Sequence, residues 1–296
     1  MSDDTTKKER LWLLPESDRG VLPAGLYLVA TPIGNLRDIS IRALDTLAAV
    51  DLIACEDTRV SKKLFSYYGL KKDLLSYNDH SSEEQRAKIL SAVAGGKAVA
   101  LVSDAGTPLV SDPGYKLVRA ALEQGVSVTA IPGANAPLSA LQLSGLPSDK
   151  FSFIGFLPPK AGAREKMLRE WRGGPGTLIA FETAPRLLDT LGSIHAVLGD
   201  RNVAVVREIT KLYEESRRAS VAELITHYKA KGPPKGEIVL VIGPGEVSFD
   251  DADIDAQLRE ALKNMSTKDA AAFVAEITGR PKKDLYQRAL DISKND

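Results

Sequence analysis

The sequence of 296 residues has one cysteine, three histidines and no excess of charge of either sign. The single cysteine, Cys55, excludes an internal disulfide and ends an apolar run, so we expect a buried thiol in a reducing compartment. Scattered histidines without metal-ligand spacing predict no metal site. The 39 basic and 39 acidic residues cancel, which argues against a protein that binds nucleic acid over its whole surface. No apolar run approaches the ~20 residues of a membrane span, and we expect a cytoplasmic protein without a membrane partner.

Two glycine-rich phosphate-binding signatures are also missing. A dinucleotide fingerprint needs three glycines at fixed spacing, whereas the loop after the first apolar run has only Gly34. No Gly-x-x-x-x-Gly-Lys-Ser/Thr segment for a nucleoside triphosphate occurs. These absences disfavour a nicotinamide-dependent oxidoreductase. Asp104 directly follows an apolar run and suits an amine or a ribose hydroxyl better than a phosphate, so the sequence favours an adenosine-like ligand with few phosphates.

Three apolar runs end in short loops rich in glycine, proline and small polar residues. They cover residues 26–30, 98–102 and 126–131. Such runs are typical of buried parallel strands, whose carboxyl ends open into a ligand site. We therefore expect one crevice lined by three loops.

The alternation of apolar runs and amphipathic segments predicts two α/β domains. The first has strands 26–30, 51–55, 98–102 and 126–131 and helices 39–49, 58–68, 82–94, 114–124 and 135–143, which is the pattern of a doubly wound parallel sheet. The second has strands 151–156, 177–182, 203–207 and 236–242 and helices 162–172, 185–198 and 220–230. We expect a disordered tail at 1–22, domains at 23–147 and 148–247, and a helical extension at 248–296. Two short helices about Gly279 in that extension fit a helix-turn-helix or a plain helical hairpin.

Four segments, ATPIGNLRDIS, ACEDTR, SDAGTPLVSDPG and IPGANA, resemble the tetrapyrrole-methylase-like superfamily of S-adenosylmethionine enzymes, and the resemblance extends over roughly residues 25–245. Within it they are most similar to the bacterial methyltransferases that modify a ribose 2′-oxygen of a decoding-region cytidine in 16S ribosomal RNA. The resemblance implies S-adenosylmethionine in a cleft between the two α/β domains, a homodimer, and 16S ribosomal RNA as substrate. We expect the assembled small subunit to be recognised, because one modest basic patch would hardly give high RNA affinity at cellular salt. Methylation of a tetrapyrrole or corrinoid precursor, or of a modified protein residue, stays open, as does an assembly factor that only holds RNA.

The resemblance also selects residues for the cofactor. Asp104 would accept from a hydroxyl or from the α-ammonium group, and Phe181 would pack on adenine. Asn135 also fits well as a helix N-cap. For Asp112 we expect a structural role, as the N-cap of helix 114–124 with Pro113 at its first position. We expect the cofactor to contact Ile33, Asp104, Ala105, Gly106, Thr107, Pro108, Asn135, Ala136, Phe181 and Pro244.

A ribose hydroxyl is a weak acid, so a proton acceptor would assist its methylation. The candidates are Asp57, His80, Glu182 and a lysine with a lowered pKa, and the sequence does not choose among them. Asp57 fits equally well as the cap of helix 58–68. Guanidinium and ammonium groups bind RNA phosphates, and some of the candidate cations also fit solvated helix faces. We expect substrate contacts from Arg59, Lys62, Arg164, Lys166, Arg186, Arg207 and Lys211.

Overall fold

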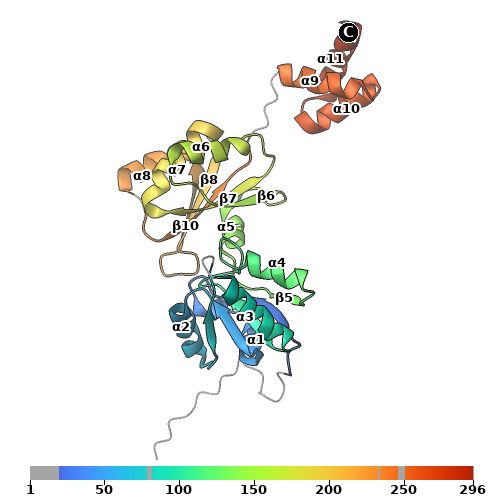
Figure 1. Ribbon diagram of the computed structural model, residues 1–296. Coiled ribbons are helices and arrows are strands. Elements are labelled where there is room, and N and C mark those ends of the chain that lie inside the picture. The colour runs from blue at the N-terminus through green and yellow to red at the C-terminus, as the bar shows by residue number, and fades with distance from the viewer. Residues whose placement is uncertain (1–19, 79–81, 233, 246–250, 296) are drawn as a thin grey trace, which may run out of the picture. The chain divides into compact units, whose positions relative to one another are not determined.

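The computed structural model describes residues 20–78, 82–232, 234–245 and 251–295. The chain divides into two compact units, one comprising residues up to 169 together with 176–243, the other comprising 170–175 and 244–296. The first unit contains two five-stranded sheets and the second contains helices (Figure 1), which confirms the predicted fold class. Most of the predicted tail, residues 1–19, lies outside the described residues. Among the described residues, no helix combines the length and the apolar character that crossing a membrane requires.

The first sheet is entirely parallel, with strand order β3-β2-β4-β1-β5. The central strand β4 is buried along its whole length, as expected where helices cover both faces of a sheet. The three residues of β3 are too few for a periodic pattern, and the sequence did not predict this strand. The strands are β1 Gly25–Val29, β2 Leu52–Cys55, β3 Leu74–Ser76, β4 Ala98–Val102 and β5 Val128–Ile131.

Helices cover both faces of this sheet, which confirms the doubly wound pattern. Helices α1 (Ile41–Ala49) and α2 (Thr58–Tyr68) pack on one face, and α3 (Glu83–Ala94) and α4 (Tyr115–Glu123) pack on the other. A short 3-10 helix, η2 (Leu36–Asp38), precedes α1.

The start of α4 differs from the prediction. Gly114 is its N-cap residue and no side chain caps the helix, so the predicted role of Asp112 as the cap is wrong. Gly114 has φ 134°, and a Cβ there would lie 2.7 Å from Leu101 Cδ2. The chain therefore passes close against β4 at this point, where a side chain would not fit.

The second sheet is mixed, with strand order β6-β7-β10-β8-β9. Only β6 and β7 are parallel, and the other pairs are antiparallel. In consequence Glu237, the first residue of β10, pairs with Thr183, the last residue of β7. The β9 sequence ESRRAS shows no apolar alternation, so the pattern did not reveal it. The strands are β6 Phe151–Phe156, β7 Thr177–Thr183, β8 Asn202–Arg207, β9 Glu215–Ser220 and β10 Glu237–Ile242.

Helix α5 (Ala136–Ser144) packs on the second sheet, although the sequence prediction placed it in the first domain. Its residues Ala140 and Leu141 share a core cluster with Ile179, Val206 and Val241. The predicted boundary at 147/148 stays a prediction. The remaining helices of this half are α6 (Ala161–Glu170), η3 (Ala184–Arg186), α7 (Leu187–Leu198) and α8 (Val221–Lys231).

The second unit has its own small core. Helices α9 (Asp251–Leu262), α10 (Thr267–Thr278) and α11 (Lys282–Asn295) pack around Leu258, Val274 and Leu285. An ion pair joins Arg288 of α11 to Asp255 of α9.

Candidate active site

Hydrogen bonds tie together the three loops that follow β1, β4 and β5. The backbones of Thr31 and Gly106 exchange two hydrogen bonds, with N···O distances of 2.9 and 3.0 Å. Thr107 Oγ1 donates to Ala134 O at 3.1 Å and accepts from Asn135 Nδ2 at 3.2 Å. Because the chain leaves β1 and β4 toward opposite faces of the sheet, these loops lie at a topological switch point, where open α/β sheets bind ligands.

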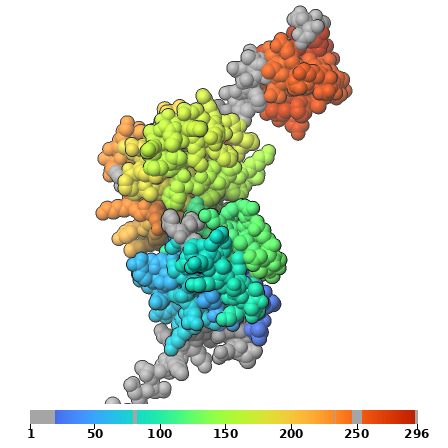
Figure 2. All heavy atoms as spheres, viewed as in Figure 1, coloured from blue at the N-terminus to red at the C-terminus, as the bar shows by residue number. Residues whose placement is uncertain are grey.

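A cavity of about 530 Å³ lies between these loops and the second sheet; we call it the apolar cavity. In the space-filling view the part of the chain that carries the first sheet adjoins the part that carries the second sheet (Figure 2). The volume of the apolar cavity falls within the range of small-molecule sites, roughly 300–1,000 Å³. The loops of the first sheet contribute Ile33 and residues 105–107, 110–112 and 135–137, and the second-sheet half contributes Phe156, Ile209 and residues 181–185 and 236–239.

Next to Ile33 and Ile209 of the apolar cavity, two loops make a tight contact. Asn35 N donates to Thr210 Oγ1 at 3.0 Å. A Cβ at Gly34 would lie 2.7 Å from Thr210 Oγ1 and 3.1 Å from Ile209 O, so only glycine allows this approach. Thr210 itself has φ 66°, an uncommon conformation for a β-branched residue. The contact holds Ile33 and Ile209 on the cavity wall.

A second cavity, of about 590 Å³, lies at the ends of β2 and β4; we call it the polar cavity. Ser111 lines both cavities, so they adjoin at this residue. Asp104 Oδ1 accepts a hydrogen bond from Asp57 N at 3.0 Å and thereby joins the loops after β2 and β4. The polar cavity is lined by residues 56–59, Ser76, Asn78, Asp104, Ser111 and Pro113.

Asp57 is held by Arg59. The Asp57 carboxylate accepts from Arg59 N at 2.8 Å, which caps α2 as the alternative prediction had it, and forms an ion pair with Arg59 Nη2 at 2.6 Å. The hydrogen-bonded guanidinium lowers the pKa of Asp57 to about 2. A carboxylate with so low a pKa is a weak proton acceptor. The structure therefore does not support Asp57 as the general base.

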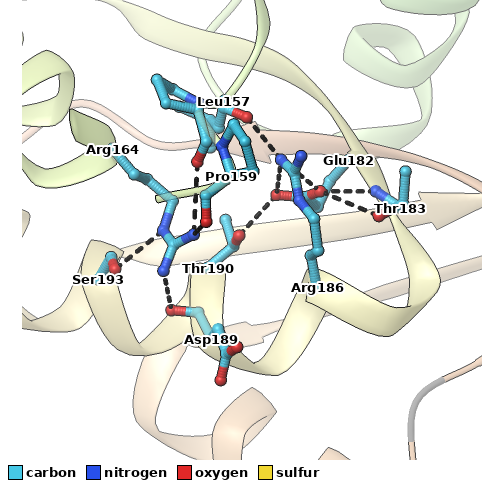
Figure 3. Close-up of polar contacts among 10 residues, drawn as sticks. Leu157, Pro159, Arg164, Glu182, Thr183, Arg186, Asp189, Thr190 and Ser193 are labelled. Atoms are coloured by element: carbon cyan, nitrogen blue, oxygen red, sulfur yellow. Dashed lines mark hydrogen bonds and ion pairs between the residues drawn. The ribbon is translucent and has the colours of Figure 1, made fainter. Parts of the chain in front are cut away.

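Glu182 is also unsuited to that role. Its side chain is completely buried, and its carboxylate accepts from Thr183 N at 2.7 Å and Thr190 Oγ1 at 2.5 Å (Figure 3). Arg186 Nη2 lies 2.9 Å from Oε1 and also donates to Leu157 O at 2.5 Å. The sequence predicted that Glu182 is catalytic and that Arg186 faces a substrate phosphate. The structure supports neither role, because the two side chains form an ion pair with each other. His80, the third candidate base, lies outside the described residues.

Arg164 also differs from its predicted role in RNA binding. It was expected on an RNA-binding helix face but is only 4% exposed. Its Nε donates to Ser193 Oγ at 3.0 Å, and its Nη1 donates to Pro159 O at 3.2 Å. Arg164 and Leu168 are four residues apart on α6, so both lie on its buried face. Lys166 is exposed, as predicted.

The other predicted substrate cations differ in their partners. Arg207 pairs with Glu215 at 2.9 Å, and Lys211 pairs with Glu208 and Glu237, so their charges are balanced within the protein. Lys62 is exposed on α2, and Arg59, although paired with Asp57, is 86% exposed. The predicted cations therefore do not form one surface. Among the residues that the structure describes, no group of three or more His, Cys, Asp or Glu side chains could hold a metal ion.

Most of the predicted cofactor residues line the apolar cavity. They are Ile33, Ala105, Gly106, Thr107, Asn135, Ala136 and Phe181. Asn135 also caps α5, so both of its predicted roles are compatible. Asp104 instead lines the polar cavity, and Pro108 is buried and lines neither. The prediction for Pro244 is wrong, because the antiparallel β10 enters the cavity with its first residues and Pro244 follows its opposite end.

The sequence prediction missed several residues of the apolar cavity, among them Phe156, Ser111 and Ile209. Phe156 and Phe181 form a pair with ring centroids 5.2 Å apart. The signal for Phe156 was available, because it ends an apolar strand directly before a Leu-Pro-Pro loop. Nothing local marks Ile209, whose place depends on the contact with the loop of Gly34.

Comparisons with known proteins identify the family. Residues 25–225 match the Tetrapyrrole (Corrin/Porphyrin) Methylases, and residues 249–293 match the RsmI C-terminal HTH domain. The chain is 50% identical over 273 residues to a Ribosomal RNA small subunit methyltransferase I of Mesorhizobium japonicum, covering 92% of this chain and 93% of that protein. It is 54% identical over 272 residues to a protein of the same name from Erythrobacter litoralis, covering 92% and 96%.

A solved structure shares the fold. The structure of Uroporphyrin-III C-methyl transferase from Thermus thermophilus, complexed with S-adenyl homocysteine, is similar with a TM-score of 0.53 at 20% identity and covers 74% of this chain and 97% of that one. The sequence matches confirm the resemblance that the four loop segments indicated. The chain therefore belongs to the tetrapyrrole methylase family.

Proposed function

We propose that this protein methylates the ribose 2′-oxygen of a cytidine in the decoding region of 16S ribosomal RNA, with S-adenosylmethionine as the methyl donor. The family and the names of the two bacterial relatives support an RNA methyltransferase of the small ribosomal subunit. The observation that carries the proposal is the pair of cavities that adjoin at Ser111. A methyl transferase must bring a donor and an acceptor to one point, and these cavities provide two binding sites with one shared wall.

The residues of the apolar cavity fit S-adenosylmethionine. Phe181, Ile209 and Val239 provide apolar surface for the adenosine. Gly106 has φ 86°, and a Cβ there would lie 3.2 Å from Ile33 Cγ2, so a side chain at this position would crowd the cavity wall. The backbone around Gly106 can thus approach a ligand closely. The Asp112 carboxylate on the wall suits a ligand that carries positive charge.

The polar cavity fits the acceptor nucleotide. Arg59 presents an exposed guanidinium, which suits an RNA phosphate. Thr58, Ser76 and Asn78 offer hydrogen-bonding groups for a ribose or a base edge. The hydrogen bond from Asp57 N to Asp104 joins the loops after β2 and β4, and Ser76 Oγ at the end of β3 donates to Glu56 O at 3.4 Å. These contacts hold the cavity in shape before RNA binds.

Positioning is the main catalytic contribution of these residues. S-adenosylmethionine supplies a methyl group already activated on a sulfonium. The protein has to hold the hydroxyl in line with that methyl and exclude water, and positioning of this kind contributes up to about 7–11 kcal/mol. Asp57 has a pKa of about 2, and the buried Glu182 carboxylate forms an ion pair with Arg186. Neither carboxylate is therefore suited to remove the hydroxyl proton.

The test is methyl transfer from radiolabelled S-adenosylmethionine to small ribosomal subunits from cells that lack this protein. Free ribosomal RNA and a tetrapyrrole precursor serve as competing substrates, and labelled nucleotides are identified after digestion. We expect label on a ribose 2′-oxygen, reduced by Asp104→Ala and unaffected by Asp149→Ala, a change at an exposed carboxylate. Label on the tetrapyrrole alone would contradict the proposed substrate, and no binding of S-adenosylmethionine would contradict the proposed cofactor.

We further propose that the protein acts in the cytoplasm as a homodimer on the assembled small subunit. A protein whose 39 basic and 39 acidic residues cancel gains little overall from phosphate contacts at cellular salt, so a second copy and a preformed RNA surface would raise affinity. Tyr115 and Leu122, exposed large apolar residues on α4, are candidates for a protein contact. Light scattering should give twice the monomer mass of 31.9 kDa, and Leu122→Glu should lower it; a monomer in the wild type would contradict the dimer.

A further inference from the structure

Two arginine side chains hold the loop that connects β6 to α6. Arg164 Nη1 donates to Pro158 O at 3.4 Å and to Pro159 O at 3.2 Å. Arg186 Nη2 donates to Leu157 O at 2.5 Å, so three consecutive carbonyls accept from two guanidinium groups. Figure 3 shows both groups directed at this loop. Two prolines in succession have no backbone N–H to donate, and the loop depends on such side-chain contacts for its conformation.

The same guanidinium groups are anchored on the elements behind the loop. Arg164 donates to Ser193 Oγ at 3.0 Å and to Asp189 O at 3.4 Å, both on α7. Arg186 pairs with Glu182 of β7, and Thr190 of α7 donates to the second oxygen of Glu182. We call Arg164, Arg186, Glu182, Thr190 and Ser193 the arginine clamp. Its hydrogen bonds and ion pair join the β6–α6 loop, the end of β7 and α7 to one another.

The arginine clamp lies directly behind the aromatic wall of the apolar cavity. Phe156 immediately precedes the clamped loop, and Phe181 immediately precedes Glu182. Phe156 is 55% exposed, so packing alone does not hold it, and its ring contacts Phe181 with centroids 5.2 Å apart. Arg164, Thr190 and Ser193 do not themselves line the cavity. Their contribution to ligand binding must therefore pass through the backbone that carries the two rings.

We propose that the arginine clamp is a positioning element for the methyl donor, which sets Phe156 and Phe181 in the geometry that receives the adenosine before it binds. This inference rests on the proposed function of the apolar cavity. A wall ordered in advance spares the ligand the entropic cost of immobilising these side chains. The described residues that line the polar cavity all lie between positions 56 and 113, so none of them belongs to the arginine clamp. The clamp should therefore affect binding of the methyl donor and leave binding of the RNA unchanged.

The experiment compares Arg164→Met with Arg169→Met on the same helix. Arg169 is 57% exposed and serves as the matched control. For each variant we measure the Kd of S-adenosylmethionine by calorimetry. We also measure the KM for each substrate and kcat with small ribosomal subunits. We expect Arg164→Met to raise the Kd and KM for S-adenosylmethionine roughly tenfold, with kcat at saturation and the KM for subunits unchanged within about twofold. Arg169→Met should match the wild type. Arg164→Lys should not restore binding, because one ammonium cannot reach all the acceptors that the guanidinium fork serves.

A milder variant keeps the test decisive if Arg164→Met fails to fold. Ser193→Ala removes one anchor of Arg164, and we expect a roughly threefold rise in the Kd for S-adenosylmethionine in a folded protein whose unfolding temperature falls only modestly. Unchanged Kd values in folded Ser193→Ala and Arg164→Met, or a fall in kcat without a change in Kd, would overturn the clamp proposal. Failure of the wild type to bind S-adenosylmethionine would instead overturn the proposed function, so the two failures are distinguishable.

Discussion

The two cavities on either side of the β4 loop are alike in size and opposite in character. Their volumes are about 530 and 590 Å³. Phe181, Ile209 and Val239 line the apolar cavity, whereas ionisable and polar side chains such as Asp57 and Arg59 line the polar cavity. The two cavities therefore differ in the polarity of their lining residues and not in volume. The loop after β4 lines both of them.

The cavities also differ in origin. All residues of the polar cavity lie between positions 56 and 113, within the first sheet and its loops. The apolar cavity needs both sheets, because Phe156, Phe181 and the start of β10 form the wall opposite the first-sheet loops. Changes to the contact between the sheets should thus act on the methyl donor first, and changes at the ends of β2 and β4 should act on the acceptor.

The largest expected effect is that of Phe181→Ala in the apolar cavity. Loss of an aromatic surface for a base costs about 1–3 kcal/mol, and a factor of ten corresponds to about 1.4 kcal/mol. We expect the Kd for S-adenosylmethionine, measured by calorimetry, to rise roughly ten- to hundredfold while RNA affinity is unchanged. Phe151→Ala, at the exposed start of β6, is the control. An equal loss of RNA binding would break the distinction between the cavities.

The next effect is that of Asp104→Ala in the polar cavity. The change removes the acceptor of the Asp57 N–H and frees the loop after β2. A hydrogen bond of this kind contributes about 0.5–1.5 kcal/mol, so kcat/KM for small subunits should fall up to roughly tenfold. The Kd for S-adenosylmethionine should stay within about twofold. A large rise in that Kd would instead support the cofactor contact that the sequence predicted for Asp104.

A smaller effect is expected of Gly34→Ala at the contact between the two halves. The added Cβ would lie 3.1 Å from Ile209 O and even closer to Thr210 Oγ1. Overpacking of this kind costs about 1–3 kcal/mol, part of which the exposed loops can relieve by moving. We expect a KM for S-adenosylmethionine several-fold higher and a lower unfolding temperature. Gly162→Ala is the control, since a Cβ there meets no atom within 4 Å; equal behaviour of the two variants would show that the loops do not need this contact.

The smallest effect concerns the ionisation of Asp57. Its pKa of about 2 lies below the value near 3.9 of an unperturbed aspartate. The stabilisation from this group is therefore present above about pH 4 and is lost as the pH falls through about 2. Carbon NMR of the Asp57 carboxyl should show the low midpoint, and Arg59→Ala should return it toward 4. A wild-type midpoint near 4 would mean that the Asp57–Arg59 pair does not form in solution, and a midpoint near neutral pH would restore Asp57 as a candidate base.

Local patterns predicted much of the fold and of the site. Helix 58–68 and strands 98–102 and 151–156 were predicted with the observed bounds, because caps and uninterrupted apolar runs define them. The loops that carry Gly106 and Asn135 were predicted at one crevice, because parallel strands place their carboxyl ends at one edge. Strand β9 escaped prediction, since its polar sequence carries no alternation and its conformation depends on pairing with β8.

The sequence by itself determined four of the five strands of the first sheet and the helices that cover it, where the ligand loops lie, and which family the loops resemble. These properties depend on periodicity, caps and turns within a few residues of each other. Only the tertiary structure decided that β10 runs antiparallel to β7. This direction places the first residue of β10, Glu237, at the cavity and its opposite end, next to Pro244, away from it. It also decided that Arg164 and Glu182 are internal, and that Asp104 belongs to the polar cavity. The physical reason is that strand direction and the partners of a buried charge depend on residues far apart in the chain, as Arg164 and its partner Ser193 are.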